Sequence, residues 1–265
     1  MIKPPASLPL WPYPRWVAHR GAGALAPENT LAALRVGAGY GYRMFECDVK
    51  ISADGIPFLL HDTRLERSTN ARALFGPDAS AVAGDHPWGQ LSQLDAGSWH
   101  SRAFAGEPLA TLQAVAAFCQ HNAYLLNIEI KPTPGAEFQT GVVVAGYAAH
   151  VWRDQAVPPL LSSFAPSALQ AALETAPAMP RALLLEKQST DWLRVARELG
   201  CCAIVCQHTL WSQDTVTQAR NAGFRTMSYT VNDMPVAQRL LELGLDSIIT
   251  DRVDLFAPAF PGLHV

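Results

Sequence analysis

The architecture of this chain can be inferred from one run of residues, Met44-Phe45-Glu46-Cys47-Asp48-Val49-Lys50-Ile51, which is apolar enough for a buried strand yet carries two carboxylates. Glu46 and Asp48 are two residues apart, so a strand points both side chains to one face and Cys47 to the other. Similar runs predict strands at 16–19, 44–51, 124–130, 160–163, 182–185, 203–206, 226–229 and 247–249. Helix-like segments alternate with them at 30–39, 112–121, 165–175, 192–199, 215–222 and 235–243. About eight such units are typical of a TIM (β/α)8 barrel.

The composition agrees with a single barrel domain spanning residues 1–265. Of the 265 residues, 49% are hydrophobic and 16% are charged, which allows a large core. The net charge of −3 and the pI near 6.2 provide no basic surface, so we expect no nucleic-acid partner. No apolar run has transmembrane length, and the N-terminal residues resemble neither a signal peptide nor an anchor. We therefore expect a cytoplasmic protein with no membrane partner.

The cysteines point to the same compartment. Their odd number and the lack of paired spacing argue against a disulfide framework, and they stand at Cys47, Cys119, Cys201, Cys202 and Cys206. We expect buried free thiols.

One segment interrupts the alternation of strands and helices. After the second strand and a short apolar run, 57–60, a region at about 62–108 contains no strand–helix unit. Roughly fifty residues are too many for an ordinary connection, so we expect a small inserted region that caps the catalytic face. Its aromatic residues Phe75, Trp88, Trp99 and Phe104 need packing partners, which disfavours a disordered loop.

A metal site is predicted where neighbouring strands carry acids. Glu129 and Lys131 repeat, at the end of the next barrel strand, the spacing of Glu46 and Asp48. Unpaired carboxylates inside a barrel would be costly, and ligation by oxygen alone favours Mg²⁺ or Ca²⁺ over zinc. The alternative is a salt-bridge cluster with Arg20 and Lys131 that binds no metal.

Two histidines end apolar runs beside these acids. His19 and His61 could supply a general acid and a general base near neutral pH. Arg20 and Lys131 are suited to hold phosphate oxygens. Asn29, in the helix start Pro27-Glu28-Asn29-Thr30, could reach the substrate from its loop, although an ordinary helix start explains its neighbours equally well.

Taken together, these motifs resemble the glycerophosphodiester phosphodiesterase family, most closely its short cytoplasmic bacterial members associated with glycerol-phosphate uptake. The resemblance runs from about residue 11 to 260. It rests on the motifs His19-Arg20-Gly21, Pro27-Glu28-Asn29-Thr30, Glu46-x-Asp48, Asp54-Gly55, His61-Asp62, Asn127-Ile128-Glu129-Ile130-Lys131, Tyr229-Thr230-Val231-Asn232 and Thr250-Asp251. Tyr229 departs from the family pattern, in which Trp is common.

The resemblance implies a TIM barrel with a small inserted region after the second strand. It implies metal-dependent hydrolysis of glycerophosphodiesters, such as glycerophosphocholine or glycerophosphoethanolamine, to sn-glycerol 3-phosphate and an alcohol. By the same resemblance one divalent ion, Mg²⁺ or Ca²⁺, would be held by Glu46, Asp48 and Glu129, with His19 and His61 as the acid–base pair. The expected partner is this small-molecule substrate, and the expected assembly is a monomer or a homodimer.

Two alternatives are weighed against this function. Another TIM-barrel phosphodiesterase or phospholipase would also pair histidines at a barrel mouth, but a membrane-active lipase needs an apolar rim or a secretion signal, and the sequence shows neither. A non-catalytic phosphodiester-binding module would not need both His19 and His61, because binding alone requires no acid–base pair.

Overall fold

Eight parallel strands close into a barrel in the computed structural model, which describes residues 8–187 and 189–258. Closure occurs at β1, which pairs with both β9 and β2. The parallel strands follow the order of the chain around the barrel: β1 (Trp16–Ala18), β2 (Met44–Ile51), β4 (Leu125–Ile130), β5 (Leu160–Ser163), β6 (Arg181–Leu185), β7 (Ala203–Gln207), β8 (Arg225–Tyr229) and β9 (Ser247–Thr250). The predicted TIM barrel is confirmed, with strand ends within one residue of those expected from the sequence.

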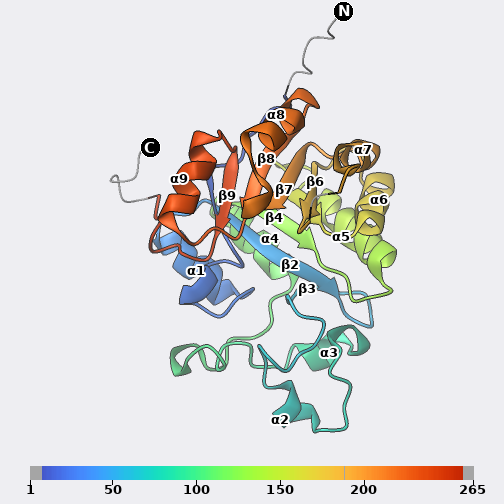
Figure 1. The fold of residues 1–265 in the computed structure, drawn as a ribbon. Helices are drawn as coiled ribbons and strands as arrows, with labels where there is room; N and C mark the ends of the chain where they lie inside the picture. The colour runs from blue at the N-terminus through green and yellow to red at the C-terminus, as the bar shows by residue number, and fades with distance from the viewer. Residues whose placement is uncertain (1–7, 188, 259–265) are drawn as a thin grey trace, which may run out of the picture.

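Helices surround the barrel on its outer side (Figure 1). They are α1 (Leu31–Gly39), α4 (Leu112–His121), α5 (Glu137–Val151), α6 (Pro166–Thr175), α7 (Trp192–Glu198), α8 (Gln213–Asn221) and α9 (Met234–Glu242). Side-chain caps fix several starts, as where Thr30 accepts the Ala33 N–H and opens α1. The sequence analysis did not single out α5, because its consecutive valines at 142–144 look strand-like.

The barrel interior is apolar at one level and acidic at the next. Met44 belongs to the interior cluster, and Glu46 and Asp48 share its side of β2 because strand side chains alternate. The interior cluster consists of Tyr13, Val17, Met44, Leu160, Ala182, Leu184, Ala203, Val205, Met227 and Ile249. The acids therefore lie above a packed apolar layer, toward the carboxyl ends of the strands.

The inserted region packs on its own hydrophobic cluster. It follows β3 (Pro57–Leu59), a short strand antiparallel to β2, and contains the short helices α2 (Ala71–Phe75) and α3 (Trp88–Leu91). Figure 1 shows it as a separate lobe beside β3. Its cluster comprises Phe58, Leu60, Leu65, Ala71, Ala83, Leu91, Leu94, Ala96 and Leu109, with Phe75 and Trp88 packed against it. The aromatic residues expected to pack do so in part, since Phe104 joins the main core and Trp99 is 40% exposed.

The described helices are too short or too polar to span a membrane. Among the described helices, none combines the length and the apolar character required to cross a bilayer.

The loop that follows β1 depends on a close approach to α1, which leads to a stability prediction. Gly21 has a φ of +99°, and its carbonyl oxygen would lie 2.1 Å from a Cβ added at Gly37 of α1. We expect Gly37→Ala to lower the free energy of unfolding by about 1–3 kcal/mol, the usual cost of overpacking. Gly39 lies in the same helix with open space around it, so Gly39→Ala should change stability by less than about 1 kcal/mol. Denaturant unfolding of both variants tests this, and equal effects would contradict the proposed contact.

Candidate active site

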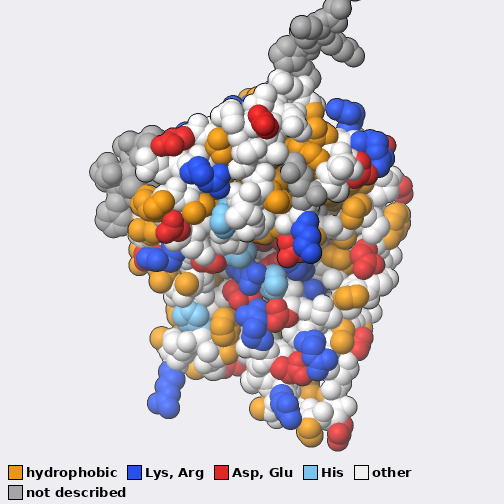
Figure 2. All heavy atoms as spheres, viewed as in Figure 1, with side chains coloured by type: hydrophobic (Ala, Val, Ile, Leu, Met, Phe, Trp, Pro, Cys, Tyr) orange, Lys and Arg blue, Asp and Glu red, His pale blue; other side chains and the backbone are white. Residues whose placement is uncertain are grey.

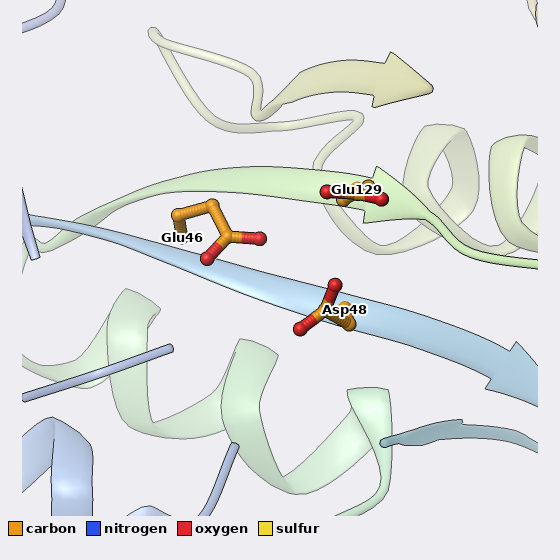
Figure 3. A group of neighbouring side chains, drawn as sticks. All are labelled: Glu46, Asp48 and Glu129. Atoms are coloured by element: carbon orange, nitrogen blue, oxygen red, sulfur yellow. The ribbon is translucent and has the colours of Figure 1, made fainter. Parts of the chain in front are cut away.

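Three carboxylates from two neighbouring strands meet inside the barrel mouth. Glu46 and Asp48 come from β2 and Glu129 from β4, and Asp48 is the register partner of Glu129. Figure 3 shows the three side chains grouped on these strands. One oxygen from each lies within 4.8 Å of the others, and the residues are 2%, 1% and 8% exposed. At that separation two ionised carboxylates repel by roughly 3 kcal/mol in a medium of effective dielectric constant 20.

Cations neutralise part of this charge. Lys131 Nζ donates to Glu129 Oε1 at 2.7 Å and lies 3.6 Å from Asp48 Oδ1. Arg20 Nε lies 3.4 Å from Asp48 Oδ2. Glu46 accepts the backbone N–H of Arg20 at 3.0 Å, but its other oxygen, Oε1, is buried without a hydrogen-bond partner among the described residues. The salt bridges expected in the metal-free alternative are therefore present, yet they leave one carboxylate oxygen unsatisfied.

The pKa values reflect the same imbalance. Burial, together with repulsion by Asp48, raises the pKa of Glu46 well above its usual value and that of Glu129 to about 7. Against the effect of its own burial, Arg20 and Lys131 hold the pKa of Asp48 below its usual value. The cluster carries more acid than its cationic partners can balance. A divalent cation fits it, since all donors are oxygens and one of them lacks a partner.

Asn29 lies behind this cluster. Its Nδ2 donates to Asp48 Oδ2 at 2.8 Å, and its Oδ1 accepts the backbone N–H of Asp48 at 3.0 Å. Asn29 is 2% exposed and has a φ of +61°. Both polar atoms of the Asn29 amide are bonded to Asp48. A direct contact of Asn29 with the substrate stays a prediction.

Each of the two histidines is held by a carboxylate at Nδ1. His19, just after β1, lies 2.6 Å from Asp251 Oδ1, and Asn232 Nδ2 donates to the other oxygen of Asp251 at 2.8 Å. His61, just after β3, lies 2.8 Å from Asp62 Oδ1, and burial lowers the pKa of its ring. A carboxylate at Nδ1 favours a proton on that nitrogen and leaves Nε2 for proton transfer.

These groups border one cavity of about 370 Å³. The cavity is lined by His19, Arg20, His61, Glu129, Lys131, Phe164, Glu186, Gln207, Tyr229 and Thr230, of which the first five are predicted site residues. Glu46 and Asp48 are buried beside Glu129. Figure 2 shows acidic, basic and histidine side chains gathered near the middle of this face. The structure thus brings together the predicted histidines, cations and acids.

Sequence reasoning missed several residues that support the site. Asp251 and Asn232 were noted only as parts of motifs, although Asp251 follows the last strand as the other site residues follow theirs. Lys50 was also missed: it shares the face of Asp48, and its Nζ donates to the Lys131 carbonyl oxygen at 3.0 Å. Its place at i+2 from Asp48 was a signal that could have revealed it.

Comparisons with known proteins point to one family. The model of the glycerophosphoryl diester phosphodiesterase family matches residues 19–255. The chain is similar to an Oleispira antarctica phosphodiesterase solved with the product sn-glycerol 3-phosphate, at 31% identity and a TM-score of 0.81, covering 90% of this chain and 93% of that one. It is 28% identical over 257 residues to a Bacillus subtilis glycerophosphodiester phosphodiesterase, covering 91% and 84% of the two chains. A glycerophosphodiester phosphodiesterase structure from Agrobacterium tumefaciens aligns with a TM-score of 0.73 at 27% identity, covering 92% and 99%.

Metal binding can be separated from a salt-bridge cluster by unfolding measurements. In chelator, Glu46→Gln should be at least as stable as the unsubstituted protein, because it removes one of three buried, mutually repelling acids. Mg²⁺ or Ca²⁺ at about 100 times its Kd should stabilise the unsubstituted protein by about 2.7 kcal/mol and Glu46→Gln much less. Thermal unfolding with and without each ion provides the measurement.

The matched control is Glu198→Gln, which alters an exposed pair with Arg194 and should leave the response to the ion unchanged. No shift of the unsubstituted protein with either ion would favour the metal-free salt-bridge cluster.

Proposed function

Because the chain belongs to the glycerophosphoryl diester phosphodiesterase family, we propose that it hydrolyses glycerophosphodiesters to sn-glycerol 3-phosphate and an alcohol with the help of one divalent ion, Mg²⁺ or Ca²⁺. The observation that carries the proposal is the meeting of two carboxylate-oriented histidines with the acidic triad at one barrel mouth. Family membership argues against the phospholipase alternative. The paired histidines support catalysis over a pure binding module.

In this proposal Glu46, Asp48 and Glu129 hold the ion. When bound, it would neutralise charge on the phosphodiester and help to orient it. Asn29 keeps Asp48 in position through its two hydrogen bonds. Arg20 and Lys131 have donors at the cavity and would bind the non-bridging phosphate oxygens.

The two histidines move the protons. One Nε2 accepts the proton of the attacking hydroxyl group as the oxygen–phosphorus bond forms. The other donates a proton to the oxygen of the departing alcohol as its bond to phosphorus breaks. Asp251 and Asp62 hold the rings and stabilise whichever imidazole becomes charged. Attack by water gives sn-glycerol 3-phosphate directly, whereas attack by the glycerol C2 hydroxyl gives a cyclic phosphate that water opens in a second step.

The cavity wall provides support for cationic alcohols such as choline or ethanolamine. Phe164 and Tyr229 form an edge-to-face pair with ring centroids 5.5 Å apart, and Glu186 lines the same cavity. The centroid of the Phe164 ring already lies 5.4 Å from Lys131 Nζ, so the Tyr229 ring and the Glu186 carboxylate are the groups left to attract an ammonium head group. We therefore include glycerophosphocholine and glycerophosphoethanolamine among the substrates.

The remaining proposals concern the whole chain. We propose one catalytic domain spanning 1–265, acting on a small molecule as a monomer or homodimer without nucleic-acid or membrane partners. A cytoplasmic location is supported by the cysteines, all five of which are free in the described residues.

Turnover of glycerophosphocholine, followed by a coupled assay for sn-glycerol 3-phosphate, tests the function. We expect turnover with Mg²⁺ or Ca²⁺ and its loss in chelator. Full turnover by metal-free protein would remove the ion from the mechanism, and no turnover of any glycerophosphodiester would refute the function.

The histidines can be told apart by the choice of leaving group. His19→Ala and His61→Ala should each lower kcat on glycerophosphocholine by about 10²–10⁴-fold. With a p-nitrophenyl ester the leaving group needs no proton, so the variant that lacks the general acid should recover most of its rate. A variant with unchanged kcat on the choline ester would exclude that histidine from catalysis.

The cavity wall can be tested through its acid. Glu186→Gln should lower kcat/KM for glycerophosphocholine by about 2- to 5-fold, the effect of one exposed charge pair. The uncharged head group of glycerophosphoglycerol should show no such loss. Equal changes for both substrates would argue against a head-group contact at Glu186.

A further inference from the structure

Arg67, in the inserted region, contacts at once the two carboxylates that hold His61 and Arg20. We propose that Arg67 is a positioning residue that fixes His61 and Arg20 relative to each other, which makes the inserted region a working part of the active site. This inference rests on the proposed function, since it assumes that His61 and Arg20 act on the phosphodiester.

The guanidinium of Arg67 makes hydrogen bonds on two sides. Toward Asp62, Nε donates to Oδ2 at 2.6 Å and Nη2 to Oδ1 at 3.1 Å. Toward Glu28, Nη1 donates to Oε2 at 3.0 Å and Nη2 to Oε1 at 2.6 Å. Both carboxylates are held through two oxygens, the geometry that a planar fork allows and an ammonium group does not.

Each carboxylate continues to an active-site group. Asp62 Oδ1, held by Arg67, also lies 2.8 Å from His61 Nδ1. Glu28 Oε1, held by Arg67, also accepts from Arg20 Nη1 at 3.1 Å. A network of hydrogen bonds therefore links His61 to Arg20 through Asp62, Arg67 and Glu28, whose charges alternate in sign. Because His61 and Arg20, at the two ends of this network, face one substrate, a shift of Arg67 would misplace both residues.

The orientation of Asp62 matters most for His61. The hydrogen bonds from Arg67, opposed by partial burial, lower the pKa of Asp62 to about 2, so it stays an acceptor for the Nδ1–H of His61. That proton on Nδ1 determines that Nε2 performs the transfer. Without Arg67 the Asp62 carboxylate can rotate into solvent and release the ring.

Arg67 is not part of the hydrophobic core. Its side chain is 43% exposed, and its guanidinium carbon lies 5.7 Å from the centroid of the Trp99 ring. Substitution should therefore leave the fold intact, and the loss can be assigned to the site.

Steady-state kinetics on glycerophosphocholine provides the first test. Arg67→Gln should lower kcat by about 10- to 100-fold, the range for a lost orienting contact or a misplacement of about 1 Å. Arg67→Lys should lose nearly as much, because it keeps the charge but not the fork. Arg64→Gln is the matched control: Arg64 pairs with exposed Glu66 in the same region, and its loss should leave kcat unchanged. Full kcat in either Arg67 variant would overturn the proposal.

A spectroscopic test does not depend on turnover. Side-chain ¹⁵N shifts of His61 should report a single neutral tautomer, protonated at Nδ1, in the unsubstituted protein and a tautomer mixture in Arg67→Gln. The double variant Asp62→Asn/Arg67→Gln should have a kcat no lower than the poorer single variant, because Arg67 acts on His61 through the same contact that Asp62→Asn disturbs. An unchanged tautomer or additive losses would refute positioning through Asp62.

The proposed function and the positioning role of Arg67 can be refuted separately. If the unsubstituted enzyme hydrolyses no glycerophosphodiester, the proposed function is wrong, while the tautomer comparison still tests Arg67. If it hydrolyses them and the Arg67 variants match it, the function stands and the positioning inference is wrong.

Discussion

Three acids held within 4.8 Å of one another at the edge of an apolar barrel core are the central electrostatic constraint of this molecule. Met44 and the apolar layer around it fill the barrel on one side of the acids, so the carboxylates of Glu46 and Asp48 cannot move apart in that direction. Lys131 and Arg20 offset part of the repulsion, and Asn29 keeps Asp48 from turning away. Such an arrangement is costly without a further cation, in keeping with the divalent ion proposed for the site.

The two histidines flank this acidic centre from different supports. His19 is braced by Asp251 and Asn232, which stand at and near the carboxyl ends of the last two barrel strands. His61 is braced by Asp62, whose own anchor, Arg67, belongs to the inserted region. One of the two histidines is thus held by the barrel alone and the other by the barrel and the insertion together. Diversity in the insertion would therefore act on one histidine more than on the other.

The sequence predicts the barrel and most of the site because both follow from short-range periodicity. Alternation places Glu46 with Asp48 and Glu129 with Lys131, and parallel strands bring such pairs to one mouth. Long-range partners have no such signal. Arg67 meets Glu28 across 39 residues of sequence, and Asn29, whose backbone adopts a left-handed conformation, meets Asp48 across 19. The helix α5 gave no clear periodic signal, because its three consecutive valines resemble a strand although they lie on a helix, with Val144 buried in the main core.

The position of the insertion follows from how its two ends are joined. Leu60 donates its backbone N–H to the Asp48 carbonyl at 3.1 Å, which fixes the residue before His61 against β2, the strand of Glu46 and Asp48. The far end returns beside β3, where Leu59 donates to the Ala110 carbonyl at 2.8 Å and Phe58 bridges to Thr111. Since both ends of the inserted region are held at β3, the segment between them can change in length without moving the barrel. The one element that must keep its place is the first turn after His61, because it carries Asp62 and Arg67 to the active site. An inserted region that varies far from the barrel but keeps Asp62 and Arg67 in place can change the surface near the cavity without disturbing the position of His61.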